Sequence, residues 1–420
     1  MRAAGSGAGP AVSTAVAHRR RRVLSVLCGT QIVSWGVLYY AFPVLAPDIA
    51  ARAGWSTTAI TGAFSAGLLV SAGVGIPVGR RLDVAGPRRI MAGGSVLGAT
   101  ALVLIALAPS QIAFTVGWLV AGVAMAGVLY PPAFTAIARW YGPDRVRALT
   151  VLTLAGGLAS TVFAPLTAAL QDHLTWRGVY LTLAAILLVV TVPAHWWGLR
   201  APWPAPDAPP GRGSVGAAGT DSPGRVVGSP RFVAVVTALA LAGFAAFAAL
   251  INLVPLLLER GMDARSAALA LGLGGAGQVV GRLAYPALSA RVGVRARTVV
   301  ILLAVALSIT ALGVFRSPPV LILAAVGAGV ARGLFTLVHA TAVSDRWGAA
   351  HYGRLTGVLS APITVTVALA PWAGTVLADL LGTYAAAFYL MGVLSLIGAL
   401  VAALLDRGPG QRVGITTASR

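Results

Sequence analysis

The stretch GQVVGRLAYP, residues 277–286, places an arginine, Arg282, inside an otherwise apolar segment of the chain. A charged side chain within a transmembrane helix costs from about 3 to more than ~10 kcal/mol, depending on how far it reaches toward water. Its presence therefore indicates either a functional site or a side chain that extends to the membrane surface. The choice depends first on whether this segment spans a membrane.

The composition indicates that lipid surrounds most of the chain. Of the 420 residues, 58% are hydrophobic and only 10% are charged, whereas soluble proteins carry about 25% charged residues. The net charge of +20 reflects 31 arginines, because the chain has no lysine. These arginines lie in small groups between apolar runs of helix length, which is typical of membrane proteins and argues against nucleic acid as a partner.

The reactive side chains are too few for catalysis or metal binding. The single cysteine, Cys28, lies in the first apolar run and cannot form an internal disulfide. Clusters of His, Cys, Asp or Glu, which an enzyme or a metal site needs, are not found in the sequence. We therefore expect neither an enzyme nor a cofactor or metal.

Twelve apolar runs are long enough to cross a membrane, since a transmembrane helix needs about 20 mostly apolar residues. The predicted spans, numbered 1 to 12 in chain order, are 23–46, 56–79, 90–108, 112–138, 148–170, 177–197, 232–258, 266–288, 297–315, 319–343, 355–380 and 384–405.

The distribution of arginine predicts the orientation of the spans. With the N-terminus inside, 24 of the 31 arginines fall on the inner side, five fall on the outer side, and Arg282 and Arg332 lie within spans. Positive charge gathers on the cytoplasmic side of membrane proteins. The sequence therefore predicts a multi-pass protein of the cytoplasmic (inner) membrane with both termini in the cytoplasm.

The longest connection divides the spans into two groups of six. Residues 198–231 are rich in Pro, Gly and Ser, so we expect a flexible cytoplasmic linker there. On this division, six-helix bundles cover residues 23–197 and 232–405, and cytoplasmic tails cover 1–22 and 406–420.

The two halves also share a sequence pattern. GRRLDVAGPRR (79–89) follows span 2, and PALSARVGVRAR (286–297) follows span 8. Such internal repeats indicate two pseudo-symmetric bundles, which in many transporters place a central binding site between halves that move relative to each other.

Twelve spans, the division into six and six, and the loop after span 2 together resemble the major facilitator superfamily over about residues 23–405. The resemblance implies an all-α polytopic membrane protein with the major facilitator fold. It also implies that the loop helps to latch an outward-open state, with its aspartate near the start of span 11. Val84 stands where the family carries an arginine. The matching residues of the G-x-x-x-D-x-x-G-x-R-R signature are Gly79, Asp83, Gly86, Arg88 and Arg89.

Three stretches are similar to the monocarboxylate-porter and oxalate/formate-exchanger branch: AGWSTTAITGAF (53–64), INLVPLLLERGMDARSAA (251–268) and GRLAYPALSARVGVR (281–295). That branch carries a substrate-binding arginine in span 8, and Arg282 falls on this position. Its proton-coupled members carry an acid one turn earlier, where this chain has Gln278. The resemblance therefore implies a carboxylate-binding arginine and leaves a coupled proton open.

The two arginines within spans each have a structural alternative. Arg282 lies roughly 9 Å from the predicted inner end of span 8, so its long side chain could extend to the membrane surface instead of binding substrate. Arg332 lies deeper, and its alternative is a packing role that the nearby glycines would allow. The acidic residues all fall in loops or near span ends. The interior therefore has positive charge without a carboxylate, which favours an anionic substrate.

Other polar side chains within the spans are weaker candidates. Asn252 and Gln278 either hydrogen-bond a ligand or bridge helices. Tyr39 or Tyr40 could line the cavity, although adjacent residues face different ways, and Tyr130 is a further aromatic candidate.

The sequence thus predicts a secondary transporter, a monomer in the lipid bilayer, that moves a small organic anion by alternating access. The resemblance makes a monocarboxylate the expected cargo, and Arg282, Arg332, Asn252, Gln278 and Tyr39 are the predicted substrate-binding residues. The alternative is an exporter of drugs or other apolar or cationic metabolites with the same fold.

Overall fold

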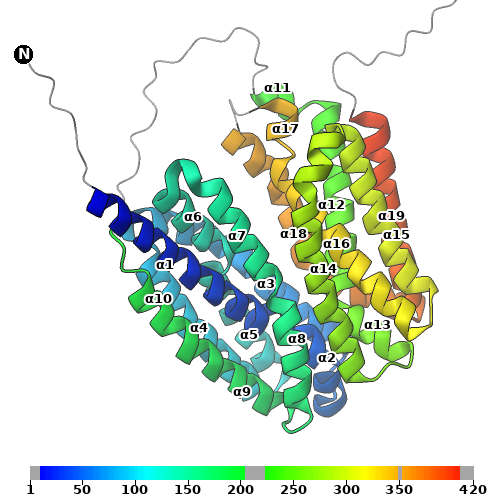
Figure 1. The fold of residues 1–420 in the computed structure, drawn as a ribbon. Coiled ribbons are helices and arrows are strands. Elements are labelled where there is room, and N and C mark those ends of the chain that lie inside the picture. The colour runs from blue at the N-terminus through cyan, green and yellow to red at the C-terminus, as the bar shows by residue number, and fades with distance from the viewer. Residues whose placement is uncertain (1–9, 204–222, 349–351, 407–420) are drawn as a thin grey trace, which may run out of the picture.

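The computed structural model describes residues 10–203, 223–348 and 352–406, and the regular structure in these ranges is helical. Twelve of its helical stretches are long and apolar enough to cross a membrane, which confirms the predicted number of spans. Figure 1 shows two groups of helices side by side. The chain enters and leaves both groups at one end of the molecule, which we call the terminal end; the other is the opposite end.

The first bundle contains spans 1 to 6, several of which are built from more than one helical segment. In chain order its elements are α1 (Pro10–Trp35), a π-helical turn (Gly36–Tyr40), α2 (Ala41–Ala53), α3 (Thr57–Ala85), α4 (Pro87–Ala106), α5 (Gln111–Val128), α6 (Tyr130–Tyr141), a 3₁₀ turn (Gly142–Asp144), α7 (Arg145–Gly157), α8 (Ala159–Gln171), α9 (Trp176–Ile186), a second π-helical turn (Leu187–Thr191) and α10 (Val192–Gly198).

The second bundle contains spans 7 to 12, together with three short helices. Its elements are α11 (Pro223–Val227), α12 (Pro230–Ile251), α13 (Leu253–Glu259), α14 (Ala264–Arg291), α15 (Val294–Val314), α16 (Pro318–Thr341), α17 (Ser344–Trp347), α18 (Tyr352–Leu381) and α19 (Tyr384–Leu405).

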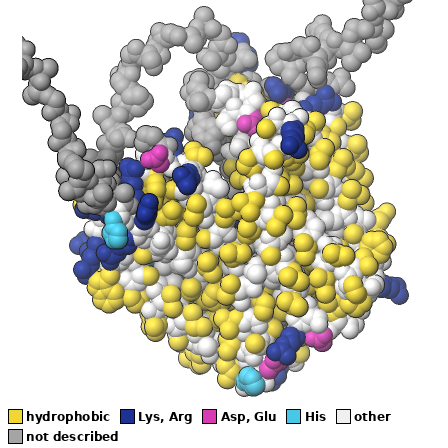
Figure 2. All heavy atoms as spheres, in the orientation of Figure 1, with side chains coloured by type: hydrophobic (Ala, Val, Ile, Leu, Met, Phe, Trp, Pro, Cys, Tyr) yellow, Lys and Arg dark blue, Asp and Glu magenta, His cyan; other side chains and the backbone are white. Residues whose placement is uncertain are grey.

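The surface is that of a membrane protein. Figure 2 shows hydrophobic side chains covering the middle of the visible face, with charged side chains gathered near the two ends. Large apolar residues such as Leu107, Val189, Leu307 and Leu323 are exposed for more than half of their surface. Lipid accounts for this exposure, because apolar side chains are as favourable in lipid as in a protein core.

Proline explains one difference between the predicted and observed spans. We predicted span 7 as one helix over 232–258, but α12 ends at Ile251 and α13 begins at Leu253. Pro255 has no N–H group for the Ile251 carbonyl four residues earlier, so the helix is interrupted there. The last span, by contrast, matches the prediction at both ends.

Contacts between the bundles follow the two-fold relation that the sequence repeat predicts. α3 of span 2 packs against α18 of span 11, and α8 of span 5 packs against α14 of span 8. Each bundle thus contributes its second and fifth spans to the interface.

Buried ion pairs hold the terminal end of the second bundle together. Asp406, fully buried just after α19, accepts hydrogen bonds from Arg231 before span 7 at 2.9 Å and from Arg346 of α17 at 2.6 Å. Arg346 also donates to the Thr298 hydroxyl at 2.8 Å. The guanidinium groups of Arg231 and Arg346, both bound to the Asp406 carboxylate, therefore join spans 7, 9 and 12 to the connection after span 10.

The described ends of the connection between the bundles are packed against helices. The Trp203 indole donates to the Asp83 carbonyl at 3.1 Å and lies against Arg139, and Val226 is buried. The predicted flexible linker falls mainly on residues 204–222, which lie outside the described residues. Of the predicted N-terminal tail 1–22, residues 10–22 instead belong to helix α1, and residues 1–9 lie outside the described residues, as do 407–420 of the predicted C-terminal tail.

Spans 8 and 10 are packed backbone to backbone. A Cβ atom added at any of four glycines would overlap the main chain of the facing helix, so only glycine permits this separation. The facing pairs are Gly277 with Val326, Gly281 with Val330, Gly329 with Gly274, and Gly333 with Gln278.

We expect Gly329→Val to lower the free energy of unfolding by about 1–3 kcal/mol, because the side chain would force spans 8 and 10 apart. Gly327→Val is the matched control on the same helix, since a Cβ there meets nothing closer than the Ser308 Cβ at 4.0 Å. Thermal unfolding of the purified variants measures the difference. Equal melting temperatures for the two variants would contradict the backbone contact.

Candidate functional site

A π-helical turn in span 1 brings two adjacent tyrosines into the interior. Tyr39 and Tyr40 are both buried, with 3% and 6% of their surface exposed, and their ring centres lie 5.3 Å apart. We expected only one of them to line the cavity, and of the two only Tyr39 belongs to the wall of the cavity described below. The wider turn over Gly36–Tyr40 changes the side-chain directions, and such turns are frequent at functional sites.

Span 4 is interrupted beside this turn, and a glutamine from span 1 satisfies the freed backbone. Pro132 lacks the N–H group that would bond the Val128 carbonyl, and the Gln31 side chain donates to that carbonyl at 2.7 Å instead. The Gln31 oxygen accepts the Trp35 indole N–H at 3.1 Å. The Trp35 ring lies 5.0 Å from the Tyr130 ring, which follows the break. Gln31 thereby fixes the relative positions of Trp35 and span 4.

A cavity of about 490 Å³ lies between the two bundles. Spans 1, 2 and 4 form one side of it, and spans 7 and 11 form the other. Its wall is mostly apolar and aromatic, and none of the described residues that line it is charged. The side chains and backbone that line it include Trp35, Tyr39, Gly75, Met125, Phe247 and Val367.

The two bundles are joined on the side of the cavity that faces the opposite end. The Thr58 hydroxyl at the start of span 2 donates to the Asp379 carboxylate near the end of span 11. About two turns further along span 2, the Ser65 hydroxyl accepts the Trp372 backbone N–H at 3.1 Å. Toward the terminal end, spans 2 and 11 instead line the cavity.

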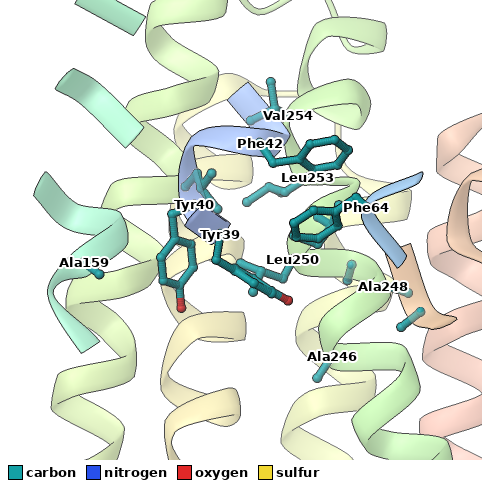
Figure 3. Close-up of a cluster of buried hydrophobic side chains, with 14 of the residues drawn as sticks. Tyr39, Tyr40, Phe42, Phe64, Ala159, Ala246, Ala248, Leu250, Leu253 and Val254 are labelled. Carbon is teal, nitrogen blue, oxygen red and sulfur yellow. The ribbon is translucent and has the colours of Figure 1, made fainter. Parts of the chain in front are cut away.

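A cluster of apolar side chains from both bundles adds to this closure. The Phe42 and Phe64 rings are stacked with centres 4.2 Å apart, and α13 packs against α2. In Figure 3 the hydroxyl groups of Tyr39 and Tyr40 point away from Phe42 and Val254, toward the terminal end. The polar atoms of these tyrosines therefore lie on the cavity side of the cluster.

Arg282 connects the two bundles. Its guanidinium crosses from span 8 to span 5, where Nη1 donates to the Thr153 carbonyl. The same nitrogen lies 3.2 Å from the position that a Cβ of Gly157 would take, and the Tyr130 hydroxyl lies over the neighbouring Gly156. Only 8% of Arg282 is exposed. The side chain thus does not extend to the membrane surface, which was the structural alternative that the sequence left open.

Arg332 is buried in span 10 with few hydrogen-bond partners. Its Nη2 lies 3.4 Å from the Gln278 side-chain oxygen, a long contact, and its Nε has no partner among the described residues. Tyr39, Tyr40 and Arg282 are close enough to interact with it electrostatically. The Tyr39 hydroxyl is also buried without a partner in the described part of the chain. These groups leave hydrogen-bonding capacity unused: Tyr39 belongs to the wall of the cavity between the bundles, and Arg332 lines a small void of about 20 Å³ within the second bundle.

Neither of these two arginines has a counter-ion. Within residues 10–203, 223–348 and 352–406, neither Arg282 nor Arg332 forms an ion pair. Over the same residues, no group of three or more His, Cys, Asp or Glu could hold a metal. The site therefore offers positive charge, hydroxyl groups and an apolar wall.

Asn252 lies at the break in span 7 rather than on the cavity wall. Its amide donates to the Ala248 and Pro371 carbonyls at 2.9 and 3.3 Å, and its oxygen accepts the Thr375 hydroxyl at 2.9 Å. These bonds join span 7 to span 11. The structure therefore places Asn252 as a bridge between helices, and it brings Gln278 beside Arg332.

The signature loop after span 2 makes contacts within its own bundle. Asp83 accepts from the Arg139 guanidinium of span 4 at 2.8 Å. Arg88 donates to the Trp196 carbonyl at 2.7 Å and stacks on its ring. Gly86 has a φ of 71° between α3 and α4, which requires glycine. Gly79 and Arg89 lie on either side of this turn.

Comparison with known proteins now identifies the class. The model of the Major Facilitator Superfamily matches residues 27–318 and 287–419, and the chain belongs to this superfamily of membrane transporters. The structure resembles that of a bacterial homologue of the human lysosomal transporter Spinster in an inward-facing, unoccupied conformation. The TM-score is 0.71, with 17% identity over 93% of this chain and 97% of that chain.

Curated relatives include monocarboxylate transporters. The chain is 29% identical to monocarboxylate transporter 11 of Homo sapiens over 77% of this chain and 70% of that protein. It is 28% identical to monocarboxylate transporter 13 of Bos taurus over 60% and 55%. It is also 33% identical to an uncharacterized 38 kDa protein in the 23S RNA operon of Thermoproteus tenax over 41% and 45%. The matches to the last two span about half of each relative. The chain thus belongs to a superfamily of multi-pass membrane transporters and resembles its monocarboxylate branch, as predicted.

The sequence reasoning missed Gln31 and Trp35. Both belong to QIVSW (31–35), where a polar residue and an aromatic residue lie four apart and therefore on one helix face. The Pro-Pro pair at 131–132 indicates that a carbonyl one turn earlier, that of Val128, has no helical N–H partner and needs another donor such as Gln31.

Replacing Gln31 with methionine, of similar shape but without donors, should lower the free energy of unfolding by about 1–3 kcal/mol, because the Val128 carbonyl loses its partner. Gln111→Met, at an exposed position at the start of span 4, should have little effect. Thermal melting of both variants makes the comparison. A Gln31 variant as stable as the Gln111 variant would mean that the carbonyl does not depend on Gln31.

Proposed function

We propose that the protein is a secondary transporter that moves an organic anion bearing a carboxylate group, by alternating access between the two bundles. The observation that carries this proposal is the pair Arg282 and Arg332, both buried within spans and neither paired with a described carboxylate. An uncompensated buried charge is costly, and a bound anion would supply the missing counter-charge. The relatives named as monocarboxylate transporters support a carboxylate as that anion.

Arg332 is the proposed primary contact of the carboxylate. A planar guanidinium can donate two parallel hydrogen bonds to a carboxylate, and Arg332 has an unpartnered Nε and a long contact to Gln278. The Tyr39 hydroxyl, unpartnered among the described residues and on the cavity wall, is a further donor.

Arg282 is the proposed link between binding and movement. It donates to the Thr153 carbonyl of the other bundle, and a carboxylate is a stronger acceptor than a neutral carbonyl by about two-fold. A substrate that drew Arg282 from Thr153 would remove one bond between spans 5 and 8. Binding would thereby favour the rearrangement that transport requires.

The arginine distribution supports an inner-membrane protein with its termini in the cytoplasm. In that orientation the terminal end is cytoplasmic, and the structure corresponds to an inward-facing state closed on the outside by the Thr58–Asp379 bond. In the outward-open state, Asp83 would leave Arg139 for the start of span 11, and Gly79, Gly86, Arg88 and Arg89 would form the rest of this latch.

One observation favours a second candidate function, an exporter of apolar compounds. The wall of the 490 Å³ cavity carries no charged residue, so a neutral apolar cargo could bind there without involving either arginine. The dependence of binding on Arg332 separates the two candidates.

We expect Arg332→Gln to weaken carboxylate binding by at least ten-fold, because truncating one partner of a buried charge pair costs about 2–5 kcal/mol. Arg282→Gln should reduce transport as well as binding. Arg316→Gln, at an exposed position between spans 9 and 10, is the matched control. The readouts are the rise in melting temperature with added carboxylates and uptake into proteoliposomes.

An Arg332→Gln protein that bound and transported carboxylates like the Arg316 control would overturn the proposal. Stabilisation of the wild type by neutral apolar compounds alone would favour the exporter instead.

The alternating-access step can be tested at the Thr58–Asp379 bond. Cysteines at both positions, in a Cys28→Ser background, should allow a short cleavable bifunctional thiol reagent to hold the opposite end closed. We expect transport to stop, substrate binding to persist, and reduction to restore transport. The two single-cysteine variants serve as controls, and unchanged transport by the cross-linked protein would exclude an opening at this place.

A further inference from the structure

The cavity and the arginines offer a ligand two different environments. The wall between the bundles is built from Trp35 and Met125 on one side and from Phe247 and Val367 on the other. Its polar atoms are few, and no charged residue lines it. A small hydrophilic anion would leave this apolar surface without a partner.

Positive charge approaches this wall through Tyr39, because Arg332 itself lines a small void within the second bundle and not the wall. Tyr39 belongs to the wall and is close enough to Arg332 for an electrostatic interaction, and the Tyr39 hydroxyl has no partner among the described residues. From Tyr39 the wall continues along span 2 as far as Gly75 and Ile76, toward the terminal end. A ligand with its anionic group at Tyr39 and Arg332 would have its remaining atoms beside apolar side chains.

The volume is that of a site for a larger molecule. Pockets that enclose drug-sized ligands measure about 300–1,000 Å³ and are mostly apolar with a few convergent polar groups. The cavity measures about 490 Å³ and is open on one side, so it has room for a larger molecule than a two- or three-carbon acid.

We propose that the substrate is an amphipathic carboxylate, with an aromatic or extended apolar body that occupies the cavity between spans 1, 2, 4, 7 and 11. This inference rests on the proposed function, since the carboxylate is assigned to Arg332. It adds that the body of the substrate, and not its charge, determines which carboxylates are carried.

Affinity should then increase with the apolar surface of the ligand. Adding a phenyl ring to acetate, to give phenylacetate, should strengthen binding by roughly ten- to a hundred-fold, and each further methylene by about four-fold while the cavity has room.

Gly75 provides a test of where the body lies. It lines the cavity, and a Cβ built there meets nothing within 4 Å. Gly75→Phe would therefore add a ring at the cavity wall through a Cβ that meets no neighbour. Gly73→Phe is the matched control, because Gly73 is exposed on the same helix, equally unobstructed, and not part of the wall.

The experiment measures dissociation constants of acetate, phenylacetate, 4-phenylbutyrate and the neutral 4-phenyl-1-butanol for the protein in lipid nanodiscs, with empty nanodiscs subtracted. We expect tighter binding from acetate to 4-phenylbutyrate. Gly75→Phe should weaken 4-phenylbutyrate at least ten-fold with little change for acetate, and Gly73→Phe should change neither.

Two other results would each contradict a different statement. If acetate binds as tightly as the phenyl acids, and Gly75→Phe affects all acids alike, the inference is wrong while the carboxylate transporter stands. If 4-phenyl-1-butanol binds as tightly as 4-phenylbutyrate, and Arg332→Gln changes neither, the proposed function itself is wrong.

Discussion

The guanidinium of Arg332 keeps its charge within the thickness of a membrane, and the surrounding structure has to accommodate that charge. Arginine does not deprotonate in proteins, so burial cannot neutralise it as it can a carboxylic acid. The described neighbours are tyrosines, a glutamine and a second arginine, which provide dipoles but no negative charge. Such a centre is stable only if its helix is held firmly and water or an anion can approach it.

The glycine contact between spans 8 and 10 provides the firm support. Because backbone meets backbone at four places, the two helices that carry Arg282 and Arg332 form one unit within the second bundle. The break in span 4 and the π-helical turn in span 1 form the facing surface in the first bundle. In lipid, every backbone group freed by such irregularities needs a protein partner, and Gln31 is that partner for Val128.

The sequence predicts the fold well, because in a bilayer the length and polarity of each helix are set by the surrounding lipid. Span 12 is found at the predicted residues, and the position of Arg282 in span 8 follows from the same pattern. The prediction of one continuous helix for span 7 failed at the break at Asn252, and the π-helical turn at Gly36–Tyr40 was not foreseen; at both places the backbone departs from a regular helix. The hydrogen bond from Arg282 to the Thr153 carbonyl could not be predicted either, because the residue pattern of one span does not indicate which carbonyl of another span lies opposite.

Glycines at the contact between spans 8 and 10 and a glycine at the cavity wall in span 2 differ in the substitutions that they permit. At Gly281 or Gly333 any side chain collides with the backbone of the facing helix, so no substitution fits unless spans 8 and 10 move apart. At Gly75 a side chain enters open space, so a single codon can reshape the cavity wall without disturbing the packing. The packing of spans 8 and 10 and the shape of the cavity wall therefore depend on different glycines. A substitution at Gly75 can therefore change the cavity while the packing of spans 8 and 10 stays the same.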